Sequence, residues 1–143
     1  PSIFIPLFLP AFLPSSLKTH LPMPLELESV SEAFIGAAIA VHRALGPGFL
    51  ESIYENSLKI ECRERGIQAE FQKEILIHYR DELVGTHRVD VIIENDLVVE
   101  LKAIKALEDI HFAQVRSYLR ATRNKHGLLL NFASAKLTIK RVI

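Results

Sequence analysis

The sequence predicts an α/β (α+β) domain in which helices flank a central mixed β-sheet, with elements in the order ααβββαββ. Three observations support this class. Apolar residues recur every three or four positions before residue 66, alternate with polar residues between 67 and 103, and form a continuous run near 130. A further helical pattern separates the alternating segment from the continuous run.

Three segments have the spacing of helices. The first begins near Glu28 and ends before Gly46-Pro47-Gly48, which cannot continue a helix. The second runs from about Leu50 to Arg65 and ends at Gly66. The third covers about residues 108–123.

Five segments are predicted to be strands, at 67–79, 83–93, 97–103, 127–132 and 136–142. Short polar segments, residues 80–82 and 94–96, separate the first three. The continuous apolar character of 127–132 indicates a buried strand, and the alternation in 136–142 indicates an edge strand.

The first 24 residues differ from the rest of the chain. They contain six of its seven prolines, which break helices and strand ladders, and the apolar runs between them are too short to span a membrane. No basic segment precedes them, as a secretory signal requires. We expect residues 1–24 to be a tail outside the native domain, which would begin near Met23, and residues 25–143 to form a single domain.

Composition narrows the class of protein. One cysteine, Cys62, allows no intrachain disulfide, which favours a cytoplasmic protein, and with the scattered histidines it gives no zinc-ligand spacing. Because the apolar runs are short, we expect no membrane partner. The net charge is zero, but residues 101–143 carry nine Lys and Arg against two Asp and Glu, a balance of +7. A phosphate-bearing partner could use this surface, or the charges could be the solvated faces of a helix and a strand.

Three charged residues, Asp90, Glu100 and Lys102, lie within two otherwise apolar runs, residues 89–93 and 97–102. Because strand side chains alternate, the apolar odd-numbered positions predict one uninterrupted core face, and Glu100 and Lys102 share the other. Burying a charge costs several kcal/mol unless it is paired or binds a metal.

The length of the loop between the strands decides whether Asp90 joins this pair. A two-residue turn places Asp90 and Glu100 on opposite faces, whereas a three-residue loop, Glu94–Asp96, pairs them with Cβ atoms about 4.5–5.5 Å apart. We expect the longer loop, because Asn and Asp readily adopt the left-handed conformation that it needs. Two such carboxylates repel unless a cation lies between them, which predicts a Mg²⁺ site that Mn²⁺ could also fill. The alternative is a solvated sheet face on which Lys102 neutralises the acids.

Other motifs accompany the hairpin. They are the pattern G-x-x-E-x-x-Y at 48–54, the segments 41–48 and 129–132, the triplet Glu100-Leu101-Lys102 with Asp90 before it, and the segment Gln114–Tyr118. In this order and spacing the chain resembles the GxxExxY protein family, a branch of the PD-(D/E)XK nuclease-like superfamily, over about residues 27–143.

The resemblance implies a restriction-endonuclease-like core with a metal site on the hairpin. In that superfamily the Asp and the Glu bind the metal and the Lys is catalytic, and these roles carry over to Asp90, Glu100 and Lys102. The resemblance also implies that Glu51 faces the site, as a further metal ligand or a water-orienting group. The alternative for Glu51 is an acid favoured by the dipole at a helix start.

Four other residues are expected near the site. Gln114 is assigned to the catalytic group, because a Gln at this place assists the active site in related nucleases. Tyr118 and His111 share a helix face with it, and they are expected to be structural or to support the site. Tyr54 is expected to pack in the core or to orient Glu51.

The leading hypothesis is a Mg²⁺-dependent nuclease that hydrolyses phosphodiester bonds in nucleic acid, with DNA the first candidate. The alternatives are a non-catalytic nucleic-acid-binding or regulatory module that keeps the nuclease fold, and a protein-interaction role for the acidic second helix. A homodimer could be needed to grip a duplex.

Overall fold

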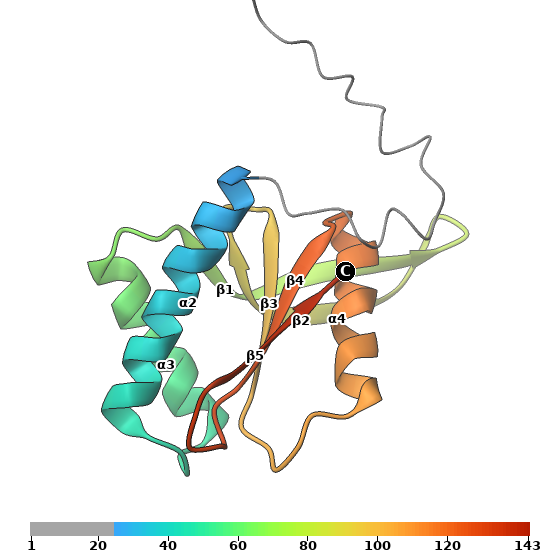
Figure 1. Cartoon of the computed structure of the whole chain (residues 1–143). Helices are drawn as coiled ribbons and strands as arrows, with labels where there is room; N and C mark the ends of the chain where they lie inside the picture. The colour runs from blue at the N-terminus through green and yellow to red at the C-terminus, as the bar shows by residue number, and fades with distance from the viewer. Residues whose placement is uncertain (1–24) are drawn as a thin grey trace, which may run out of the picture.

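The computed structural model describes residues 25–143, which form two helices, a meander of three strands, a third helix and two final strands (Figure 1). This is the predicted order ααβββαββ, so the fold class is confirmed. The expected tail, residues 1–24, lies outside the described residues.

The helices agree closely with the periodic segments. Helix α2 spans Leu25–Leu45, and Gly46-Pro47-Gly48 follows it directly. Helix α3 spans Glu51–Glu64, and α4 spans Asp109–Thr122. No described helix is both long enough and apolar enough to cross a membrane.

The five strands form one mixed sheet in the order β1-β2-β3-β4-β5. Their bounds are Ala69–Tyr79 for β1, Glu82–Ile93 for β2, Leu97–Lys102 for β3, His126–Asn131 for β4 and Thr138–Val142 for β5. Only the pair β3 and β4 is parallel, because α4 carries the chain back between them. Strand β5 lies at the edge, as predicted.

Helices cover both faces of the sheet (Figure 1). Helices α2 and α3 lie on one face over a cluster that includes Phe34, Tyr54 and Leu101. Helix α4 lies on the other face, over a cluster that includes Val98. Gly127 permits this close approach, since a Cβ there would lie 2.8 Å from a Val115 side-chain carbon.

The prediction of an uninterrupted core face at the odd-numbered hairpin positions is wrong, and the alternative of a solvated even-numbered face does not hold. Val91 packs beneath α2 and α3, but Val89 packs in the cluster beneath α4, so the odd-numbered face is interrupted at Asp90. Gln72 of β1, whose φ is 54°, lies between the residues that pair with these two valines. The even-numbered face is also not solvated, because α4 covers Ile92 and Val98.

The loop between β2 and β3 has the predicted three residues. Ile93 pairs with Leu97, and Glu94 and Asn95 both adopt the left-handed conformation, with φ of 53° and 62°. The ladder ends at the pair Val91 and Val99. Asp90 and Glu100 therefore occupy the next position along, where β2 and β3 begin to separate.

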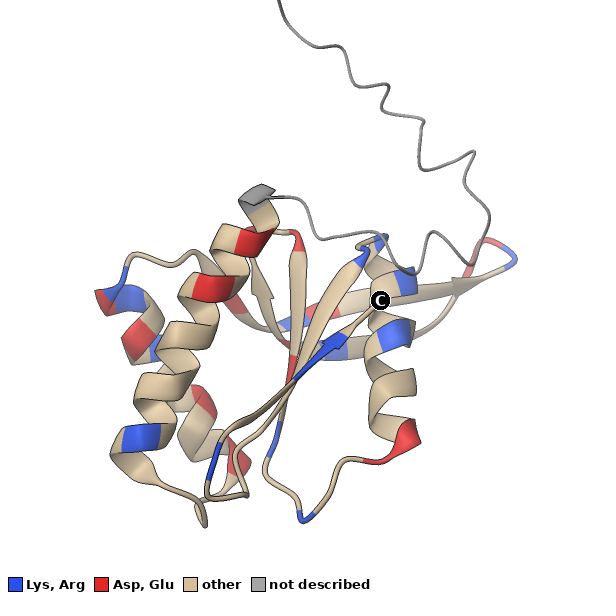
Figure 2. Ribbon diagram, in the orientation of Figure 1, with Lys and Arg blue, Asp and Glu red and all other residues tan. Residues whose placement is uncertain are grey.

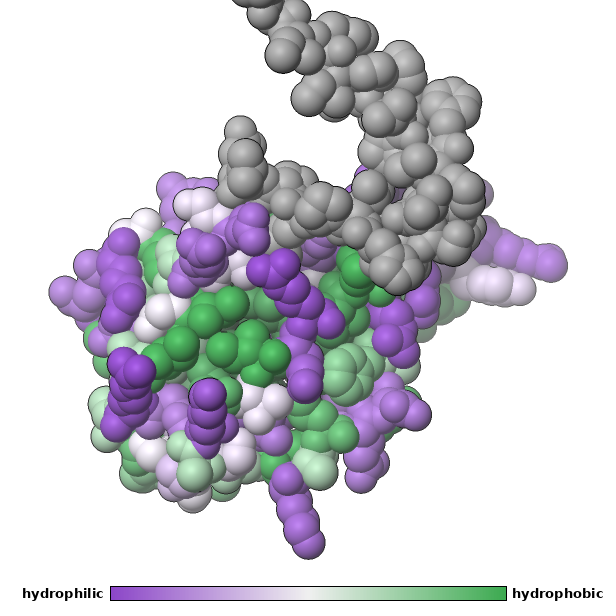
Figure 3. Space-filling view, in the orientation of Figure 1, coloured by the Kyte–Doolittle hydropathy of each residue, from purple (hydrophilic) through white to green (hydrophobic). Residues whose placement is uncertain are grey.

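An apolar hollow marks the outer face between α2 and β5. It has a volume of about 230 Å³, and its lining includes Ile39, Leu137 and Ile139. The apolar surface between these two elements is visible in Figure 3.

Candidate functional site

The site lies where β2 leaves β3, with the start of α3 on one side and α4 on the other. Asp90 comes from β2, Glu100 and Lys102 from β3, and Glu51 from the first residue of α3. Asp90 and Lys102 lie close enough that their charges alter the proton affinity of both Glu51 and Glu100. The structure thus brings together the four charged residues that the sequence indicated.

The carboxylate of Asp90 is held by the neighbouring strand. Its Oδ2 accepts a hydrogen bond of 2.8 Å from the backbone N–H of Leu101. This N–H lies beyond the last ladder pair, so the Asp90 side chain takes the place that a backbone carbonyl holds in a regular ladder. The same hydrogen bond therefore orients Asp90 and replaces the backbone pairing where the two strands separate.

Glu100 is the most unusual group of the site. Its side chain is only 4% exposed, and Oε2 is buried without a hydrogen-bond partner among the described residues. Lys102 lies beside it, with Nζ 3.9 Å from Oε1. Burial and the adjacent Asp90 raise the pKa of Glu100 far above its usual range, and Lys102 offsets this only in part. The alternative of a solvated sheet face therefore does not hold for Glu100, which is buried beside Lys102.

Strand β4 fixes the chain that follows Lys102. Asn131 is the parallel partner of Lys102, and it binds Ile104 twice, accepting from its N–H at 3.1 Å and donating to its carbonyl at 2.9 Å. Phe132 donates a further backbone hydrogen bond to the Lys102 carbonyl at 2.8 Å. Asn131 is thus a supporting residue whose role the sequence did not reveal.

The pattern G-x-x-E-x-x-Y has a structural reason. The Tyr54 hydroxyl donates to the Gly46 carbonyl at 2.6 Å and accepts from the Phe49 N–H at 3.2 Å. The φ of 107° at Gly48, which favours glycine, turns the chain between these two contacts. Tyr54 is fully buried, so it is a core residue that also fixes the loop from which Glu51 starts.

The pKa of Glu51 depends on the other charged residues of the site. Partial burial and the charge of Asp90 raise its pKa, whereas Lys102 and a hydrogen bond from the backbone of Ala103 lower it in part. Its charge interactions with Asp90 of β2 and Lys102 of β3 place it at the site as well as at a helix start.

Helix α4 contributes a hydrogen-bonded pair. Gln114 donates from Nε2 to the Tyr118 hydroxyl at 2.8 Å. Burial, followed by the charge of Glu100, raises the pKa of Tyr118 to about 12, so it remains protonated beside the carboxylates. His111 has a different function, because its Nδ1 accepts from the Glu108 N–H at 2.8 Å and caps the start of the helix.

Two residues at the site were missed by sequence reasoning. Gln72 of β1 donates from Nε2 to Oδ1 of Asp90 at 3.2 Å and also to Oε1 of Glu55. Glu55 follows Glu51 by four residues, so its place on the same helix face could have been read from the spacing. Gln72 gave no such signal, because its position depends on its left-handed backbone.

The donor set suits magnesium. Among the described residues, no three or more His, Cys, Asp or Glu side chains are arranged as a ready metal-binding group. Magnesium does not require one, since it is usually bound by one or two carboxylates with water and substrate phosphate. The unpartnered Oε2 of Glu100, next to Asp90, is the kind of buried oxygen that such a cation satisfies.

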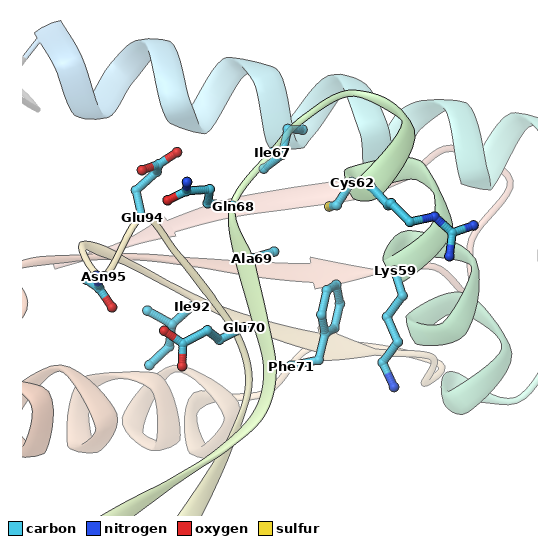
Figure 4. A pocket seen from close by; sticks show the side chains of 11 residues that line it. Lys59, Cys62, Ile67, Gln68, Ala69, Glu70, Phe71, Ile92, Glu94 and Asn95 are labelled. Atoms are coloured by element: carbon cyan, nitrogen blue, oxygen red, sulfur yellow. The ribbon is translucent and has the colours of Figure 1, made fainter.

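A cavity of about 490 Å³ lies away from these residues. Lys59, Cys62 and Phe71 are among the residues that line it, beside α3 and the edge strand β1 (Figure 4). None of the four charged site residues contributes to its wall.

Two comparisons with known proteins found a match, one to a family and one to a fold. The sequence model of the PD-(D/E)XK nuclease superfamily matches residues 28–142. The fold is similar to that in the crystal structure of SSO0001, with a TM-score of 0.52 and 23% identity over 64% of this chain. The matched part is 48% of SSO0001, so the chain spans about half the length of that protein. The curated proteins include no match.

Proposed function

Because the chain belongs to the PD-(D/E)XK nuclease superfamily, we propose that it is a Mg²⁺-dependent nuclease that hydrolyses phosphodiester bonds, with DNA as the first candidate substrate. The observation that carries this proposal is the buried Glu100 carboxylate. It has an oxygen without a partner, it lies beside Asp90, and a lysine follows two residues later. A cation and a phosphate would satisfy all three charges at once.

Each site residue has a role in this proposal. Asp90 and Glu100 would hold Mg²⁺, or Mn²⁺ in its place, and Glu51 would bind the metal or orient a water. The bound metal would polarise the phosphate and lower the pKa of a water molecule.

Lys102 and Gln114 would act on the phosphate and its surroundings. The ammonium of Lys102 is 3.9 Å from Glu100, too far for a tight hydrogen bond, so it is free to stabilise charge that develops on phosphate oxygens. Gln114, with Tyr118, would supply hydrogen-bond donors on the α4 side.

A basic strip supports nucleic acid as the partner. Arg116, Arg120 and Arg123 recur at helical spacing on one side of α4, and all three are exposed. Lys140 of β5 pairs with Leu129, which packs in the α4 cluster, so it belongs to the same side of the sheet. Figure 2 shows α4, with its basic residues, on the opposite side from the acidic helices α2 and α3. In the described part of the chain none of the four has an ion-pair partner, which leaves them available to phosphates.

The second candidate is a nucleic-acid-binding or regulatory module without catalysis. The exposed basic strip on α4 and β5 favours it, because these side chains would bind phosphates whether or not the site cleaves them. Binding without cleavage in both Mg²⁺ and Mn²⁺ is its expected result.

The test compares cleavage of plasmid and single-stranded DNA by the wild type and by Asp90→Ala and Lys102→Ala, with Mg²⁺ or Mn²⁺. The exposed Lys59, outside the site, provides the matched control Lys59→Ala. The nuclease proposal expects cleavage by the wild type and the control only. Persistent cleavage by either site variant contradicts the assigned roles, and sedimentation of the DNA complex shows whether one copy or two are bound.

A further inference from the structure

Gln72 has an unusual backbone for a strand residue. Its φ of 54° places it in the left-handed region, which costs a non-glycine residue about 1–2 kcal/mol. Its neighbours Phe71 and Lys73 pair with Val91 and Val89, so Gln72 lies opposite Asp90. The irregularity in β1 and the break in alternation of β2 thus occur at the same place.

The left-handed backbone of Gln72 accompanies a side chain that bridges two acidic residues. Its amide nitrogen lies between two carboxylates, donating to Glu55 of α3 and to Oδ1 of Asp90 at 3.2 Å. An amide turned the other way would present its oxygen to both acids and would form neither bond, so the partners define its orientation.

Together with Leu101, Gln72 holds both oxygens of Asp90. The Leu101 N–H binds Oδ2 at 2.8 Å, and the Gln72 amide binds Oδ1. Without the Gln72 donor, the carboxylates of Asp90 and Glu55 would face each other and repel. One bond from Leu101 would then have to keep Asp90 in place.

We propose that Gln72 is a positioning residue, which fixes the carboxylate of Asp90 for the cation and holds Glu55 beside it. This inference rests on the proposed function, because that function supplies the metal ion that Asp90 would bind. A left-handed Gln in the middle of β1 serves this purpose because it brings the amide to Asp90 from the neighbouring strand. Residues that support metal ligands typically contribute about 10–100-fold to metal affinity.

The backbone provides a way to separate positioning from stability. Gln72→Gly removes the amide and at the same time relieves the left-handed conformation. Arg80→Gly is the matched control, because Arg80 has a φ of 50° at the β1–β2 turn and no contact with Asp90. We expect both variants to unfold at the same temperature as the wild type or higher, and only Gln72→Gly to weaken Mn²⁺ binding in calorimetry, by about 10-fold.

A second measurement does not require metal. Amide hydrogen exchange at Leu101 reports its bond to Asp90, and we expect it to be several-fold faster in metal-free Gln72→Gly than in Arg80→Gly. If the exchange rate at Leu101 is unchanged in Gln72→Gly, the proposal is overturned. This outcome can be judged even if the wild type binds no Mn²⁺ and the proposed function fails. Wild-type Mn²⁺ affinity in Gln72→Gly, or a loss of stability not seen in Arg80→Gly, would likewise overturn the proposal.

Discussion

Replacing Glu100 by Gln should stabilise the metal-free protein. The variant keeps the shape of the side chain but replaces a titratable carboxyl group at a residue that is 4% exposed and has one oxygen without a partner. Burial and Asp90 raise the pKa of Glu100 from its ordinary 4.5 to about 10. The folded protein therefore retains a proton at neutral pH that the unfolded chain releases.

The sign and size of the effect follow from linkage. Below pH 4.5 the carboxyl is protonated in both states, so it causes no penalty. Above this pH the free energy of unfolding of the wild type falls by about 1.4 kcal/mol per pH unit. The loss of stability caused by Glu100 at pH 7 therefore has an upper bound of about 3 kcal/mol. Because this value is an upper bound, we expect about 1–3 kcal/mol in favour of Glu100→Gln at pH 7 and less than 1 kcal/mol at pH 5.

Urea unfolding with a chelator present, at both pH values, measures the difference. The exposed Glu74 provides the control Glu74→Gln, which should change little at either pH. Added Mg²⁺ should stabilise the wild type but not Glu100→Gln, since the charge is then neutralised by the cation. A variant that is less stable than the wild type at pH 7, or a difference independent of pH, would refute the reasoning.

Three further predictions concern other parts of the chain. Burial raises the pKa of the Cys62 thiol to about 11, so a thiol reagent should label it slowly until urea is added; labelling within the mixing time contradicts its burial. Tyr54→Phe should cost about 1–2 kcal/mol in urea unfolding while the ring packing is kept, because both hydroxyl hydrogen bonds are lost; wild-type stability would argue against the bond to the loop. Changing Arg116, Arg120 and Arg123 together to Ala should lower the slope of log affinity for duplex DNA against log salt by about 2–3; an unchanged slope excludes this strip from the interface.

Much of the fold could be predicted from the sequence because the local patterns agree with one another. Strong periodicity defined each helix and strand within a few residues, and the parity argument gave the three-residue loop after Ile93. That loop placed Asp90 next to Glu100 along the hairpin. The neighbourhood of Asp90, Glu100 and Lys102 was therefore accessible from sequence alone.

The remaining features depend on contacts between distant segments. The sequence left open a solvated even-numbered hairpin face, but α4 covers Ile92 and Val98 on it, and Glu100 is buried. The break between Val89 and Val91 depends on an irregular strand beside them, where Gln72 has a left-handed backbone that no propensity favours. Only the folded chain shows that this glutamine bridges Asp90 and Glu55.

The two hydrogen bonds between Asn131 and Ile104 have a consequence for the order of folding. Lys102 is followed by a segment that is fixed only when Asn131 and Phe132 reach it, 29 and 30 residues later. That contact requires the parallel pairing of β3 and β4, which closes a long loop through α4 and forms more slowly than a hairpin. The β2–β3 hairpin can form early from local contacts, but the end of β3 should become ordered late. A nascent chain that lacks β4 would then carry the acids of the site without a fixed lysine.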